Sequence, residues 1–198
     1  MKSRTRNGGF WWVYHSSTTD TVTKYLQLST PDATITNSNG GNDNIWGSSL
    51  PSSSTFGFST GAGQAHTTNE TVIAYCWAEI PGFSKFGSYT GNNSADGPMV
   101  VTGFRPRWIM FKASSTTGTW VIHDTARSTY NASTSVFYAN DPMVEYTNAG
   151  MSVDVLSNGF KPRTDASSNT NSLNVTYIYA AFAEAPTQNL FGGQSNAR

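Results

Sequence analysis

Charged side chains and cysteine are both scarce in this sequence of 198 residues. Asp, Glu, Lys and Arg make up 12% of it, about half of the ~25% found in an average globular protein. The formal net charge is zero, so no overall positive field attracts nucleic acid, and we expect no nucleic-acid partner. The single cysteine, Cys76, excludes an intrachain disulfide and a cysteine-based zinc site. Because Cys76 lies in a nearly continuous apolar run, we expect it to be buried.

Long apolar runs are missing as well. No stretch approaches the ~20 apolar residues that are needed to cross a bilayer. The N-terminal segment MKSRTRNGGFWW is basic, but the apolar core of a secretion signal does not follow it. We therefore expect no insertion into a membrane.

Aromatic and turn-forming residues are abundant instead. Aromatics reach 13% and there are 18 glycines, and so many aromatic residues argue against a disordered chain. Residues 108–111, 119–123, 135–139 and 174–184 are rich in β-branched and aromatic side chains, and Ser, Thr, Gly and Asn bound each segment. No segment has the sustained i, i+3, i+4 apolar spacing of a long helix. The sequence therefore predicts an all-β fold of short strands, as in β-sandwiches.

Two segments of the chain are near-copies of each other. TVIAYCWAEIPGFSKFG (71–87) and TYIYAAFAEAPTQNLFG (176–192) are identical at seven of seventeen positions. Earlier in each half, WVYH (12–15) returns as WVIH (120–123). We interpret these matches, which recur in the same order at offsets of 105 and 108 residues, as an internal duplication in which small insertions account for the difference.

The duplication predicts how the chain is organised. We expect two tandem β-sandwich-like repeats of jelly-roll or lectin-like type, each of about 90–105 residues, at residues 1–90 and 91–198. The near-copies would form the last strand of each repeat and be buried on both faces, so that either Tyr75→Asp or Ile178→Asp abolishes soluble expression.

One part of the second half has no counterpart in the first. Lys2 aligns with Lys112, but the strand-like residues before Lys112 match nothing before Lys2. We expect the chain to be a piece of a longer protein. The alternative is that another chain supplies this strand, because an open sheet edge invites strand addition.

No group of residues in the sequence predicts catalysis. His123 and Asp124 are adjacent, but neighbours along a strand point to opposite faces, so they are not placed as base and orienting carboxylate. The sequence has no G-x-S-x-G motif, and the polar loop around Asp43 does not match a calcium-binding pattern. We therefore expect a protein that is not an enzyme and has no cofactor and no metal site.

Four residues are candidates for glycan binding. Trp46 and Tyr130 lie among polar turn residues, with Asn44 and Asn131 close by in the sequence. An exposed aromatic ring stacks on the apolar face of a sugar, and amide groups bond to its hydroxyls. For Trp46, local packing is an equally good interpretation. We expect the tryptophans within strand-like runs to be buried in the core, namely Trp11, Trp12, Trp77, Trp108 and Trp120.

Several stretches together resemble a known but uncharacterised domain. These are YCWAEIPGFSKFGSYTGNNSADGPMVVTGFRPRWIMFK, WVIHDTARSTYN, LSNGFKPR, TYIYAAFAEAP and the ending NLFGGQSNAR. The combination is similar to a module of structural proteins from tailed bacteriophages, particularly marine ones, found toward the C-terminus of tail-fibre and related virion proteins. The resemblance covers nearly the whole chain and implies no catalytic residue.

The resemblance implies a non-enzymatic virion structural protein, made in the cytoplasm of the host cell. The favoured role is that of the distal, host-contacting part of a tail fibre or similar appendage, with recognition of a host surface glycan. The alternative is a capsid decoration or adaptor protein that acts only through protein–protein contacts. The expected partners are other virion proteins and further copies of the chain, with a trimer favoured.

Overall fold

The computed structural model describes residues 1–5, 9–37, 44–59, 69–165 and 169–184. These residues form fourteen short strands and a single turn of 3₁₀ helix, η1 (Ala149–Met151). The all-β fold predicted from the sequence is therefore confirmed. Among the described residues, no helix is long and apolar enough to cross a membrane.

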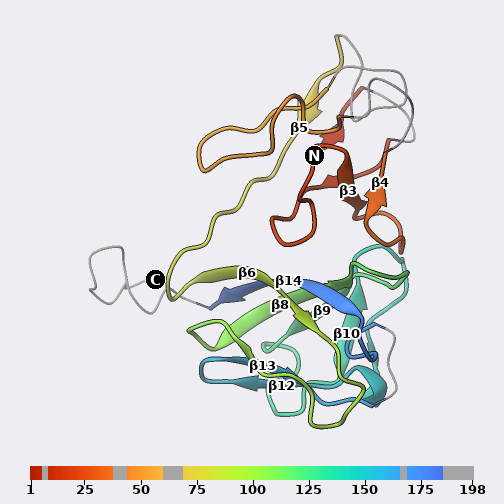
Figure 1. Cartoon of the computed structure of the whole chain (residues 1–198). Helices are drawn as coiled ribbons and strands as arrows, with labels where there is room; N and C mark the ends of the chain where they lie inside the picture. Colours follow the sequence, from red (N-terminus) through yellow and green to blue (C-terminus); the bar gives the residue numbers. More distant parts are fainter. Residues whose placement is uncertain (6–8, 38–43, 60–68, 166–168, 185–198) are drawn as a thin grey trace.

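A six-stranded antiparallel sheet is the largest element of the fold (Figure 1). Its strand order is β11-β10-β9-β8-β14-β6. The strands are β6 (Ser84–Thr90), β8 (Pro106–Ala113), β9 (Val121–Asp124), β10 (Ser135–Tyr138), β11 (Tyr146–Thr147) and β14 (Thr176–Ala183). The two longest strands, β8 and β14, pair from Tyr177↔Ala113 to Ala183↔Pro106, and β6 pairs along the other side of β14.

A three-stranded sheet packs against one face of the six-stranded sheet and completes a β-sandwich. Its order is β12-β13-β7, with β7 (Val100–Val101), β12 (Val153–Leu156) and β13 (Gly159–Pro162). The core between the two sheets is built around Phe160 of β13, which is fully buried and packs against the rings of Phe111, Tyr179 and Tyr89. Residues 84–184 therefore contain a complete two-layer sandwich.

β14 is buried on both faces, as predicted. Tyr177, Tyr179 and Ala181 alternate along the strand and face the sandwich core. Ile178 lies between them on the opposite face, where it packs with Leu26 and Trp120. This alternation is the two-residue period of a strand, and both sets of side chains are apolar because each face of β14 is covered.

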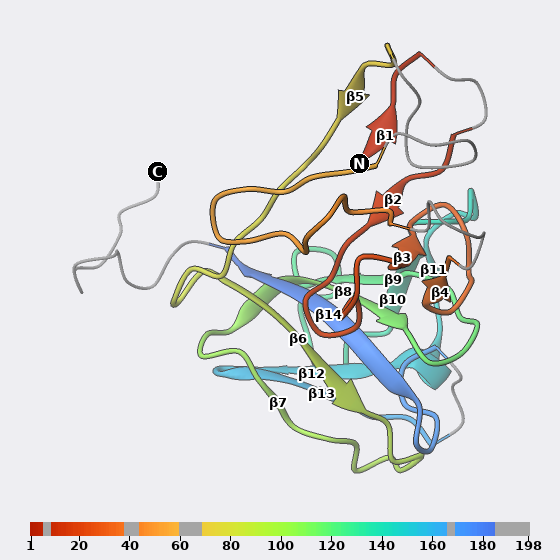
Figure 2. The same ribbon diagram turned by 45° about the horizontal axis from the view of Figure 1, so that its top comes forward.

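The N-terminal part of the chain covers the second face of the six-stranded sheet (Figure 2). It contains a three-stranded sheet of order β2-β3-β4 and a two-stranded sheet of order β1-β5. The strands are β1 (Lys2–Ser3), β2 (Trp12–Val13), β3 (Lys24–Gln27), β4 (Ile35–Thr36) and β5 (Val72–Ile73). Besides Leu26, the contact includes a hydrogen bond of 3.1 Å from the Lys112 ammonium to the carbonyl of Pro31.

The first of the two near-copies folds differently from the second. Within residues 71–79 only Val72 and Ile73 form a strand, and the last residues of the near-copy, from Ser84, belong to β6. Tyr75 is 58% exposed, Trp77 is 66% exposed, and Cys76 is exposed as well. The predictions of a buried strand at residues 71–79 and of a buried Cys76 are therefore wrong, because no described strand flanks residues 74–79 to cover them.

Strand pairing is nevertheless similar in the two halves. Lys2 pairs with Ile73, and Lys112 pairs with Ile178, which are the residues that the sequence alignment matches. β2 pairs with β3 and β3 with β4, in the same way as β9 pairs with β10 and β10 with β11. β6, which the predicted boundary after residue 90 places in the first repeat, pairs along its length with β14. The division into two repeats stays a prediction.

Candidate interaction surface

Trp46, a predicted glycan-binding residue, is buried. It is 3% exposed, and its indole Nε1 donates a hydrogen bond of 2.7 Å to the carbonyl of Lys24. Its ring packs edge-on against Tyr14, with 5.6 Å between the ring centroids. The expectation of an exposed Trp46 ring is therefore wrong, and the alternative of local packing holds. Asn44, two residues earlier, is half-buried.

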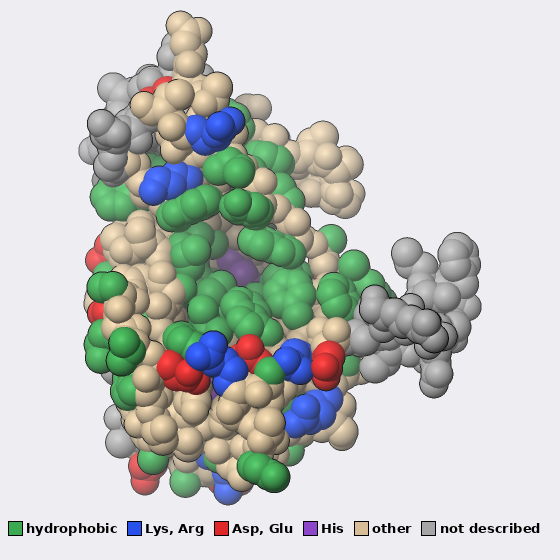
Figure 3. Space-filling view, turned by 180° about the vertical axis from the view of Figure 1, so that it is seen from behind, with side chains coloured by type: hydrophobic (Ala, Val, Ile, Leu, Met, Phe, Trp, Pro, Cys, Tyr) green, Lys and Arg blue, Asp and Glu red, His purple; other side chains and the backbone are tan. Residues whose placement is uncertain are grey.

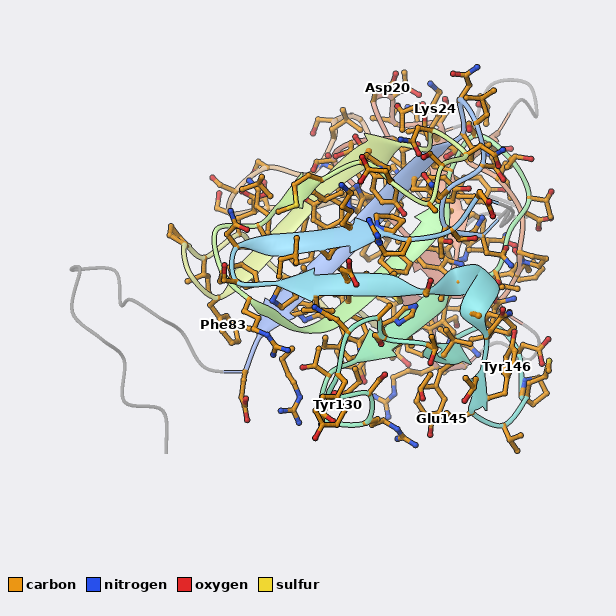
Figure 4. All side chains as sticks on the ribbon, turned by 90° about the horizontal axis from the view of Figure 1, so that it is seen from below. Asp20, Lys24, Phe83, Tyr130, Glu145 and Tyr146 are labelled. Atoms are coloured by element: carbon orange, nitrogen blue, oxygen red, sulfur yellow. The ribbon has the colours of Figure 1, made fainter. Side chains whose placement is uncertain are left out.

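Tyr130 and Asn131 lie elsewhere, in the connection between β9 and β10. Tyr130 is 85% exposed, and Figure 4 shows it at the edge of the molecule, pointing away from the sheets. The Asn131 amide bonds to the main chain of Val155: its Nδ2 donates to the carbonyl at 3.0 Å, and its Oδ1 accepts from the N–H at 2.8 Å. Asn131 therefore ties the β9–β10 connection to strand β12, and of the two predicted glycan-binding rings Tyr130 is the exposed one.

A different group of aromatic side chains gathers on the surface. The ring centroids of Trp11 and Tyr75 are 5.9 Å apart, and those of Tyr75 and Trp77 are 6.2 Å apart and nearly parallel. The Lys2 ammonium lies 5.6 Å from the centre of the Trp11 ring, a distance at which a cation is attracted to a ring face. We call Trp11, Tyr75 and Trp77 the aromatic row.

In the described part of the chain, the main chain of residues 74–77, beneath Tyr75 and Trp77, has hydrogen-bonding groups without a protein partner. From Ala74 to Trp77, no described residue outside the β1–β5 ladder forms a hydrogen bond with the backbone. The pairing resumes at Ala78, whose carbonyl accepts from the Ser84 hydroxyl at 2.8 Å. Such free N–H and C=O groups make an extended segment a template for another strand.

A second aromatic cluster lies at the end of the six-stranded sheet where β14 ends and where β6 and β8 begin. Phe182 of β14 packs against Phe83, Phe86 and Trp108, with ring centroids 5.7 to 6.1 Å apart. Seen from behind, the molecule shows hydrophobic side chains gathered across its middle, with acidic and basic side chains in a row below them (Figure 3). Apolar surface in a contiguous patch, rimmed by charge, is typical of an interaction site.

Ion pairs connect the outer ends of the strands in the sheet. Arg107 of β8 contacts Asp124 of β9 and also Glu184, which follows β14, each at 3.1 Å. In the first near-copy, Glu79 stands where Glu184 stands in the second, and it pairs instead with Lys85 at 2.8 Å. The acidic residue is therefore present in both copies, and it has a different cationic partner in each.

The two described histidines, His15 and His123, and the buried Lys112 have structural contacts. His15 Nε2 lies 3.2 Å from the carbonyl of Tyr179, and burial lowers the pKa of His15. His123 Nδ1 lies 3.0 Å from the Ser133 hydroxyl, and burial lowers the pKa of His123 to about 4. Burial also lowers the pKa of Lys112 to about 8. In the described part of the chain, no three His, Cys, Asp or Glu side chains are grouped to hold a metal ion.

The prediction that Trp77 lies in the core is wrong. Trp77 stands in a strand-like run, yet it is 66% exposed. The residue pattern of 74–79 resembles that of residues 179–184, of which 179–183 lie in β14, so this pattern carries no signal for the exposure of the aromatic row.

Fold and surface together define an all-β protein with a sandwich core and an exposed aromatic edge. The chain belongs to the family described as "Domain of unknown function (DUF7483)", which matches residues 1–186. No curated protein and no solved structure is significantly similar to the chain.

Proposed function

We propose that the chain is a non-enzymatic structural module of a bacteriophage virion, and that it works through contacts with other virion proteins. The aromatic row and the free main chain beneath it carry this proposal. Side chains that bury well and backbone groups that need partners stand on one exposed segment, as at the interfaces of β proteins. The sequence resemblance to tail-fibre and related virion proteins supplies the context.

The role that we favour for this module is the host-contacting part of a tail fibre. The alternative role is capsid decoration or an adaptor function. Mass spectrometry of purified particles whose genome encodes the chain tests the proposal. We expect the protein in the particle, with immunogold label at the fibres in the first case and over the shell in the second. A protein that is expressed in infected cells but absent from particles would overturn the proposal.

The oligomeric state of the purified protein also distinguishes the two proposed roles. Tail fibres are commonly assembled as trimers, so a trimer in multi-angle light scattering supports the fibre. A monomer that is incorporated into particles supports an adaptor or decoration protein.

Glycan recognition remains a second candidate because flat aromatic faces are on the surface. The rings of Tyr75 and Trp77 are stacked in a row, and Tyr130 is exposed on its own. A glycan array with purified protein tests this function. Saturable binding lost in Trp77→Ala would place the sugar on the aromatic row, and loss in Tyr130→Ala would place it on the β9–β10 connection. No signal in the array would remove this candidate.

A further inference from the structure

We infer that the end of the six-stranded sheet around Trp108 binds a neutral hexose unit of a glycan. The Trp108 ring stacks on the apolar face of the sugar, and one guanidinium and two carboxylates beside it bond to the sugar hydroxyls. The inference rests on glycan recognition, the second candidate of the proposed function, and gives it a site other than the aromatic row and Tyr130. Four observations support it.

A β-bulge brings Arg107 to the face of the sheet that carries Trp108. Between Phe182 and Ala183, the pairing of β14 skips one residue of β8, and that residue is Arg107. Consecutive side chains of a regular strand point to opposite faces, but a bulge re-aims one of them. Trp108 lies directly opposite Asp124 of β9, so these two side chains share a face. Arg107 reaches that face too, because its Nε donates to Asp124 Oδ1 at 3.1 Å.

The aromatic rings at this end of the sheet are only partly covered. Trp108 and Phe182 are opposite each other in β8 and β14, with ring centroids 5.7 Å apart. Phe86 of β6 packs edge-on against Phe182, also at 5.7 Å. All three side chains are partly exposed, whereas Ile178, farther back along β14, is buried. Aromatic surface is therefore open to a ligand here, and such a surface stacks on the C–H face of a sugar ring.

Hydrogen-bonding atoms beside Trp108 remain without a partner among the described residues. Arg107 contacts Asp124 through Nε and Glu184 through Nη1, each at 3.1 Å. Asp124 Oδ1 also accepts from the N–H of Ala126 at 2.8 Å. These contacts leave Asp124 Oδ2, Glu184 Oε2 and Arg107 Nη2 unbonded in the described part of the chain, and all three side chains reach solvent. Two acceptors and a donor held together suit neighbouring sugar hydroxyls, since each hydroxyl both donates and accepts.

The local charge favours a neutral sugar over an acidic one. Arg127 donates to both carboxylate oxygens of Glu145. The hydrogen bond from Glu145 raises the pKa of Arg127, and the nearby charge of Asp124 adds to this effect. With Arg107 and Glu184, the row of side chains contains three carboxylates and two guanidinium groups, so it carries one net negative charge. An anionic group on the ligand is repelled by this charge, whereas the hydroxyls of a neutral hexose are not.

Titration of the whole chain with defined sugars tests the inference. The probes are neutral trisaccharides of glucose, galactose and mannose, and trigalacturonic acid is the acidic counterpart of the galactose probe. In NMR spectra, we expect at least one neutral trisaccharide to shift the indole N–H signal of Trp108 saturably. Trigalacturonic acid should bind at least tenfold more weakly. Absence of binding by all three neutral sugars, or equal binding of the acidic one, would overturn the inference.

Variants of the whole chain show whether the ring and the carboxylate make the contact. Trp108→Ala should weaken binding at least tenfold, because it removes the stacking surface. Trp108 also packs within the protein, so Glu184→Gln provides a test at an exposed position. Glu184→Gln should weaken binding of the neutral sugar about threefold and strengthen binding of trigalacturonic acid, because it removes a charged acceptor.

Glu145→Gln is the matched control for Glu184→Gln. It removes the same charge from the same row, but Glu145 precedes β11, and β10 and β9 lie between β11 and β8. Binding of the neutral sugar should therefore stay unchanged. Equal weakening by Glu145→Gln and Glu184→Gln would contradict a site at Trp108.

The outcomes separate this site from the proposed function. Sugar-induced shifts at Trp77 or Tyr130 in place of Trp108 would leave glycan recognition standing and refute the site. If none of the sugars binds but the protein is found in particles, the site is refuted and the structural role in the virion stands.

Discussion

The indole Nε1 of Trp120 donates a hydrogen bond of 2.9 Å to the main-chain carbonyl of Gln27. The two residues are 93 positions apart, and the bond joins the six-stranded sheet to the N-terminal part of the chain. Trp120 is buried, and it packs with Leu26 and Ile178. The N-terminal part is therefore attached through a specific polar contact inside an apolar cluster.

Trp120→Phe should loosen this attachment. The substitution removes the indole donor, which leaves the Gln27 carbonyl with a long hydrogen bond of 3.4 Å from the Thr30 N–H, and it opens a small cavity, so we expect a loss of about 2–4 kcal/mol in the free energy of unfolding. Denaturant titration measures the loss, and hydrogen exchange should show faster exchange at β2 and β3 than at β13. Trp77→Phe is the matched control, because Trp77 is exposed, and it should change stability by less than about 0.5 kcal/mol.

Aspartate at Ile178 and at Tyr75 should have opposite outcomes. Ile178→Asp places a carboxylate in the apolar cluster with Leu26 and Trp120. Lys112 lies opposite it in β8, but its ammonium is already bonded to two main-chain carbonyls, so the substitution should abolish soluble expression. Tyr75→Asp introduces a charge at a solvent-exposed position, so soluble expression and the unfolding midpoint should stay close to those of the unmodified protein. Insoluble Tyr75→Asp protein would mean that residues 74–79 are covered in the folded chain.

Gly159 should not accept a side chain. A Cβ at this position would lie 2.0 Å from the carbonyl oxygen of Val100, and β13 and β7 pair there, with Gly159 opposite Val101. Gly159→Ala must separate the two strands, and we expect it to destabilise the sandwich by more than about 2 kcal/mol. Gly9→Ala meets no atom within 4 Å and should be nearly neutral. Thermal unfolding of both variants checks the contrast.

Acid should destabilise the fold through His123. Its pKa is about 4 in the folded chain, because burial opposes the charged form, whereas the pKa of an unfolded histidine is near 6.5. Between these values the unfolded chain binds the proton and the folded chain does not, so stability falls as the pH falls. The loss of stability begins as the pH falls through about 6.5 and approaches about 3 kcal/mol near pH 4.

Two measurements check the role of His123. Denaturant titrations from pH 7 to pH 4 should show the loss of stability, to which the lowered pKa of His15 adds in the same direction. Ring NMR signals of His123 should titrate near pH 4. A His123 signal that titrates above pH 6 would show that the imidazole is not buried in its neutral form.

The sequence by itself determined the fold class and the central strand. The aromatic and β-branched segments, separated by Ser, Thr, Gly and Asn, predicted an all-β chain, because short alternating runs can bury side chains only in sheets. It also determined that residues 174–184 contain a strand with two apolar faces. Trp12 and Trp120, which were expected in the core, are buried there.

Tertiary structure alone decided which of two similar segments is buried. Residues 71–79 and 176–184 carry nearly the same pattern, but β14 has β8 and β6 on its two sides, whereas the described residues place no strand beside 74–79. Burial depends on neighbours that are distant in the sequence. The same pattern therefore forms a core strand at residues 176–183 and an exposed segment at residues 74–79. Trp46 shows the converse, since its polar sequence neighbours suggested exposure, and only the fold brought Tyr14 and Lys24 around its ring.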